Sequence, residues 1–100
     1  MTPYNADNSL TCITLLEDVY NEAWENCADS YGCRLVEAIR DYKYPNGQPL
    51  NILKAVHIYK AVETLKEYNR CNDEDLRCLL NRLVRKTGYS RDELLERINI

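Results

Sequence analysis

The 100-residue sequence is poor in the residues that break regular structure, with three glycines and three prolines, and it contains no phenylalanine. This scarcity argues against a collagen-like or low-complexity chain. No apolar run approaches the roughly 18 residues that a membrane-spanning helix needs, so we expect no membrane contact. Hydrophobic residues make up 45% of the chain and charged residues 29%, which is the balance of a folded domain. We therefore expect one soluble domain over residues 1–100, with residues 1–8 as a flexible N-terminal segment.

The sequence also lacks a secretory signal. Its N-terminal residues contain neither a basic segment nor an apolar stretch, so we predict a cytoplasmic protein. The five cysteines are Cys12, Cys27, Cys33, Cys71 and Cys78. An odd number in a cytoplasmic chain favours reduced thiols over a disulfide framework. Neither the spacing of Cys27 and Cys33 nor that of Cys71 and Cys78 matches paired zinc ligands, so we expect no metal and no cofactor.

Helical periodicity dominates the chain. Apolar residues recur at three- and four-residue steps in five segments, at about 9–29, 33–43, 50–68, 73–87 and 90–99. Gly32 is expected to end the first helix, and residues 44–49, with two prolines and a glycine, to form a loop. Segment 50–68 is apolar over a wide arc, which is typical of a helix in the middle of a bundle or in an oligomer interface. The predicted fold is an all-α, compact bundle of about five helices in which the third is central.

The last two segments carry start and stop signals. Asn72 precedes the acidic residues 73–75, which complement the positive end of a helix dipole. Gly88 is expected to end that helix, and Ser90 with Glu93 forms a capping box for the next one. The predicted core consists of Leu16, Val19, Ala23, Val36, Ile39, Val56, Tyr59, Val62, Leu76, Leu80, Leu83 and Leu94.

Residues 73–99 resemble the two helices and tight glycine turn of helix-turn-helix DNA-binding domains. The resemblance implies a transcriptional regulator in which Arg91 and Arg97 contact DNA. The same helix carries three carboxylates, at positions 92, 93 and 96, which DNA phosphates would repel. We therefore prefer the alternative, a helix corner that closes the bundle, and keep DNA binding as the second hypothesis.

No catalytic motif accompanies the single histidine, His57. General acid–base or nucleophilic catalysis needs a partner within hydrogen-bond reach, and no glycine-rich phosphate loop or serine-nucleophile motif is present. Cys71, beside the Asn72 cap, is a candidate for a thiol with a lowered pKa, although the acidic residues 73–75 oppose thiolate formation. We predict that the protein is not an enzyme.

Tyrosine is the unusual component, because eight Tyr and one Trp occur without Phe. Tyr20, Tyr59 and Tyr68 are expected to pack by their rings within helices. The others, expected to be partly exposed near termini or turns, are Tyr4, Tyr31, Tyr42, Tyr44 and Tyr89. Tyr and Trp are enriched in protein-interface hot spots, so Tyr31, Tyr42 and Tyr44 are predicted partner-binding residues. Ordinary amphipathic surface residues are the alternative interpretation.

Charge is unevenly placed within a net charge of −3, with three basic and eight acidic residues in 1–49 and ten and eight in 50–100. The first helix places Glu17, Asp18, Glu22 and Glu25 on an acidic face, which would suit a basic protein partner. The alternative is a solvated helix surface. In size and charge the chain resembles small phage and plasmid inhibitors. We predict a non-catalytic cytoplasmic protein that binds another protein as an inhibitor, adaptor or assembly factor, and a homodimer is one form it could take.

Overall fold

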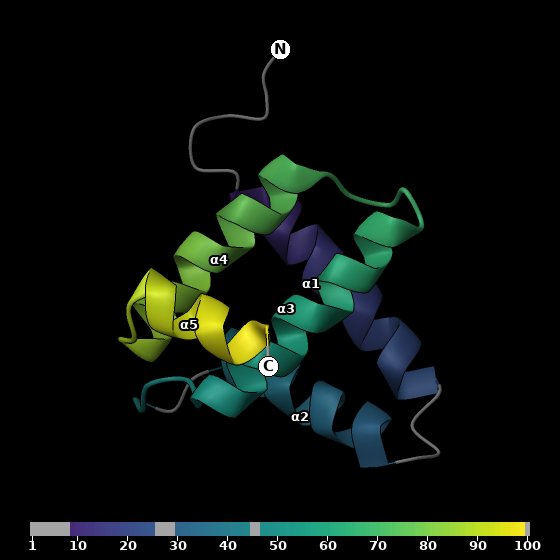
Figure 1. The fold of residues 1–100 in the computed structure, drawn as a ribbon. Helices are drawn as coiled ribbons and strands as arrows, with labels where there is room; N and C mark the ends of the chain where they lie inside the picture. The colour runs from purple at the N-terminus through teal and green to yellow at the C-terminus, as the bar shows by residue number, and fades with distance from the viewer. Residues whose placement is uncertain (1–8, 26–29, 45–46, 100) are drawn as a thin grey trace.

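The computed structural model describes residues 9–25, 30–44 and 47–99, and these ranges form five helices and no β-strand (Figure 1). In chain order they are α1 (Ser9–Glu25), α2 (Ser30–Lys43), α3 (Ile52–Glu67), α4 (Asp73–Thr87) and α5 (Arg91–Ile98). The predicted all-α fold is confirmed. The predicted flexible segment 1–8 lies outside the described residues.

Local capping interactions fix where α4 and α5 begin and where α4 ends. The side chain of Asn72 accepts from the N–H of Asp75, and the Asp75 carboxylate accepts from the N–H of Asn72. Ser90 and Glu93 make the same reciprocal pair at the start of α5. Gly88 ends α4 in the left-handed conformation with φ 80°, which glycine adopts without steric penalty. All three predicted signals are confirmed.

The turn between α3 and α4 is stabilised by backbone hydrogen bonds around a left-handed asparagine. Asn69 has φ 62°, the N–H of Arg70 donates to the carbonyl of Leu65, and the N–H of Asn69 donates to that of Lys66. This is the Schellman pattern, in which a left-handed residue satisfies the last carbonyls of a helix. The chain therefore reverses within residues 68–72.

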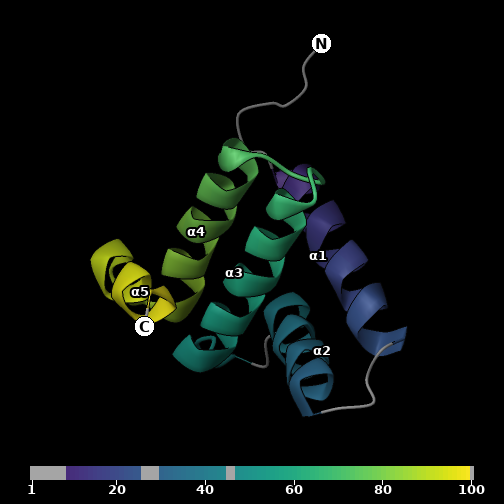
Figure 2. The same cartoon turned by 45° about the vertical axis from the view of Figure 1, so that its right-hand side comes forward.

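Helix α3 contacts each of the other four helices, as predicted. Figure 2 shows it between α4 on one side and α1 and α2 on the other. Its residues Ala55, Ile58 and Val62 are fully buried. Of the predicted core residues only Tyr59 is half-buried, and the others are buried.

The predicted break at Gly32 is wrong, because α2 begins at Ser30 and includes Gly32. Tyr42 was expected to be partly exposed near a turn, but it is 4% exposed. It lies seven residues after the buried Leu35, so the two share one face of α2. Tyr68 shows the opposite error: it follows the last residue of α3 as its C-cap and is 73% exposed.

The cysteines also depart from expectation. Cys33 is disulfide-bonded, so the prediction of reduced thiols is wrong for this residue. Cys71 and Cys78 are in no disulfide and are half-buried. The side chains of Cys12 and Cys27 lie outside the described part of the structure, so the prediction of reduced thiols stays a prediction for them.

Candidate functional site

Two aromatic side chains of α1 form a pair at the surface, in which Trp24 is exposed and Tyr20 is half-buried against the core. The rings of Tyr20 and Trp24 stack with an interplanar angle of 10° and centroids 6.3 Å apart. Trp24 is 61% exposed, although its three- and four-residue spacing from Tyr20 and the other apolar residues of α1 predicts a place on the inward stripe of the helix. The reason is geometric: Leu15, Leu16, Val19 and Ala23 fill the buried face, and Trp24 falls beside it. Stacking holds the indole on the surface in one orientation.

Lys43, at the end of α2, joins this pair to a third ring. Its ammonium lies 5.9 Å from the centroid of Tyr20 and 5.8 Å from that of Tyr44, within the range of cation–π attraction. Tyr44 is 71% exposed, as its position in the loop predicted. We call Tyr20, Trp24 and Tyr44 the aromatic strip.

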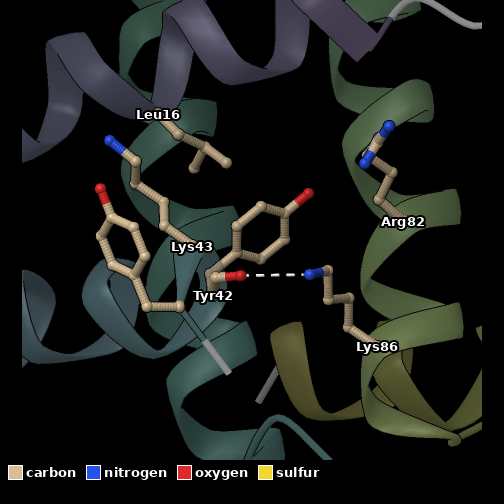
Figure 3. A pocket seen from close by; sticks show the side chains of 6 residues that line it. Leu16, Tyr42, Lys43, Arg82 and Lys86 are labelled. Atoms are coloured by element: carbon tan, nitrogen blue, oxygen red, sulfur yellow. Dashed lines mark hydrogen bonds between the residues drawn. The ribbon is translucent and has the colours of Figure 1, made fainter. Parts of the chain in front are cut away.

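The strip ends at a pocket of about 210 Å³ between α1, α2 and α4. Figure 3 shows Lys43 and Arg82 on opposite sides of the Tyr42 ring, with Lys86 reaching from α4 toward Tyr42. We call this cavity the basic pocket, because three of its lining residues are cations and none is acidic. Its lining consists of Leu16, Tyr42, Lys43, Tyr44, Arg82 and Lys86.

Backbone contacts hold Lys86 in this place. The N–H of Leu50 donates to the Lys86 carbonyl at 2.9 Å, which ties the loop before α3 to the end of α4. The Lys86 ammonium donates to the Tyr42 carbonyl at 3.1 Å and lies 4.7 Å from the Tyr42 ring centroid. A cation is favoured there because the carbonyls at the end of α2 carry partial negative charge.

The predicted acidic face is partly neutralised within the molecule. Glu17 forms an ion pair with Lys43 at 3.4 Å. Arg70 lies 3.5 Å from Asp18 and 3.3 Å from Glu22. Glu25 is exposed at the end of α1. These carboxylates border the aromatic strip on the same helix, whereas the side chain of Tyr31, another predicted partner-binding residue, lies outside the described residues.

The arginines of the DNA-binding alternative lie on α5. Arg91 donates to the side chain of Asn81 on α4, and Arg97 is exposed in the last turn. The structure places both on one short helix, together with Asp92, Glu93 and Glu96.

The Cys71 thiol is not activated for nucleophilic chemistry. It is half-buried, and its Sγ donates to the Val62 carbonyl at 3.5 Å. Burial raises the pKa of this thiol, and the Asp75 carboxylate raises it further. The hypothesis of a lowered pKa is wrong, because burial and negative charge outweigh the helix N-terminus. Within the described ranges no group of three or more His, Cys, Asp or Glu residues could hold a metal ion.

The pKa of His57 should be low. Burial lowers it below the usual 6.5, and the positive charges of Arg34 and Lys60 lower it further. Below pH 6.5 the unfolded chain then binds more protons than the folded one, so stability is lost as the pH falls through this range. We expect the NMR titration midpoint of this only histidine to lie below 6.5 and to rise in Arg34→Met. A midpoint at or above 6.5 in the unaltered protein would contradict this environment.

No protein-family model, curated protein or solved structure matches this chain. No helix in the described part of the chain is long and apolar enough to cross a membrane.

Proposed function

We propose that this protein is a non-catalytic protein-binding module, an inhibitor, adaptor or assembly factor, whose contact surface is the aromatic strip. The observation that carries the proposal is Trp24, 61% exposed and held in a ring stack with Tyr20. Tryptophan and tyrosine are enriched in interface hot spots because they bury much area with few rotatable bonds. A ring that is already oriented loses little further freedom on binding.

The strip differs from the other exposed apolar residues of the chain. Leu53 is 60% exposed near the start of α3 and Tyr68 is 73% exposed at its C-cap. Single exposed apolar residues are ordinary on protein surfaces. The strip instead joins three rings, two of them through Lys43, and borders a pocket, which gives a partner both an aromatic surface and a cavity.

The acidic residues of α1 have a supporting part in this proposal. Glu17, Asp18 and Glu22 already lie beside cations of the same chain, so they offer a basic partner less than their number implies. Exposed ion pairs of this kind contribute little energy and are screened by salt. We therefore assign the binding energy to the rings and any acceleration of encounter to the acidic face.

The test is an affinity pull-down from lysate of the native host, with and without nuclease, read by mass spectrometry. The bait is compared with two double variants that each remove two exposed apolar side chains. One is Trp24→Ser with Tyr44→Ser in the strip, and the matched control is Leu53→Ser with Tyr68→Ser. We expect a stoichiometric protein that survives nuclease, is lost with the strip variant and is kept with the control.

If both double variants capture the same amount of the partner, the contact lies elsewhere and the strip is not the binding surface. Nucleic acid that is retained by the bait and lost on nuclease treatment would favour the helix-turn-helix alternative through Arg91 and Arg97. Circular dichroism of each variant shows whether the helices are intact.

A further inference from the structure

We infer that the basic pocket binds the carboxylate of an Asp or Glu side chain in the partner protein, while an apolar side chain of the same segment lies on the aromatic strip. The inference rests on the proposed function and adds the chemistry of the ligand.

Charge makes this pocket an exception within the molecule. The whole chain has a net charge of −3, yet the pocket lining contains Lys43, Arg82 and Lys86 and no carboxylate. Among the described residues, Glu17 lies close to the pocket and pairs with Lys43. The cluster of cations attracts a small anionic group, and the net negative charge of the rest of the chain disfavours the extended phosphate backbone of nucleic acid.

Lys86 has donor capacity left for a ligand. Within the described residues its ammonium makes one hydrogen bond, to the Tyr42 carbonyl, and no ion pair. A lysine ammonium carries more than one N–H donor, so a ligand oxygen can bind without displacing that hydrogen bond. The Tyr42 ring beneath the ammonium keeps water from one side and strengthens an ionic contact made there.

Lys43 can exchange its partner. Its ion pair with Glu17 spans 3.4 Å, and the Glu17 side chain is 56% exposed. A solvent-exposed pair of this length contributes little, so a ligand carboxylate can replace Glu17 at small loss. Because Lys43 also lies over the rings of Tyr20 and Tyr44, it connects the pocket to the strip.

The size and position of the pocket indicate how the acidic and apolar residues are spaced in the partner segment that binds. A volume of about 210 Å³ corresponds to roughly seven water molecules, which is room for one side chain. Leu16 in the pocket and Trp24 on the strip are two turns of α1 apart, or about 12 Å at the rise of a helix. An extended peptide covers that distance in about three to four residues. The ligand should therefore carry an acidic residue about three to four positions from a large apolar one.

The experiment is a selection of phage-displayed random 12-residue peptides on the purified full chain, followed by titration of synthetic peptides. Trp24 is the only tryptophan, so its fluorescence reports binding at the strip when the peptides lack Trp. We expect enrichment of Asp or Glu at the stated spacing from an apolar residue. Lys86→Met should weaken these peptides about tenfold or more, since it removes a charged hydrogen bond. The matched control Lys60→Met makes the same charge change at an exposed residue of α3 and should leave affinity unchanged.

Three results would overturn the inference. They are enriched peptides without an acidic residue, equal affinities of Lys86→Met and Lys60→Met, and no enrichment at all. The first two, with a change in Trp24 fluorescence, leave the strip in place as the contact surface. In each case the pull-down with the strip variant decides the proposed function separately.

Discussion

Replacing Leu83 with alanine is expected to lower the free energy of unfolding by about 2–5 kcal/mol. Leu83 is fully buried on α4, where it belongs to the core cluster that α4 shares with α3 and α5. Removing its branched methyl groups loses contacts and leaves a cavity that the surrounding helices fill only in part. For a domain of this length that is a large fraction of the total stability.

The matched control for this change is Leu53→Ala, the same substitution at a side chain that is 60% exposed. It should change the free energy of unfolding by no more than about 0.5 kcal/mol. Urea denaturation followed by circular dichroism measures both variants. Similar values for the two leucines would mean that the buried face of α4 is assigned wrongly.

Trp24→Ala should weaken binding of the captured partner by about 30-fold or more, which corresponds to the lower limit of a hot spot. The indole is the largest exposed apolar group of the strip, and its stack with Tyr20 fixes the orientation in which it meets a partner. Isothermal titration calorimetry gives the dissociation constant. Little loss of folding stability is expected, because the side chain is mostly in solvent.

Two further variants separate contact from orientation. Tyr20→Ala leaves the indole in place but removes the ring that orients it, so we expect a smaller loss of affinity than for Trp24→Ala. Tyr68→Ala removes an aromatic ring that is 73% exposed and lies outside the strip, and it should bind as the unaltered protein does. A binding defect in Tyr68→Ala comparable to that in Trp24→Ala would show that the strip is not the main contact.

The parts of the fold that could be predicted are those encoded by neighbouring residues. The helix ends are set by Asn72, Gly88 and Ser90, which satisfy backbone groups only a few positions away in the chain. Their effect can therefore be predicted from the local sequence. The central place of α3 could be predicted because apolar residues cover more than one of its sides. Such a helix is stable when other helices pack against each apolar side.

The proposed contact surface could be predicted only in part. The exposure of Tyr44 follows from its loop position, but the three- and four-residue spacing puts Trp24 on the inward stripe of α1, because periodicity does not say how wide a stripe the other helices will cover. Lys43, Arg82 and Lys86 are far apart in sequence and meet only when α2 and α4 pack. Arginine and lysine near a helix end have an ordinary explanation in the helix dipole, and nothing in their spacing marks a pocket.

The Schellman turn at Asn69 also bears on the entropy of chain closure. Residues 68–72 and 88–90 join α3, α4 and α5, so these helices meet through short loops, whose closure costs little conformational entropy. Helix α1 instead packs against α3 and α4, which lie much later in the chain, and Arg70 donates to Glu22 across 48 residues of sequence. Contacts of that separation raise the contact order, and folding slows as contact order rises. The two rings of the strip that lie on α1, Tyr20 and Trp24, thus belong to the part of the topology that is closed over the greatest length of chain.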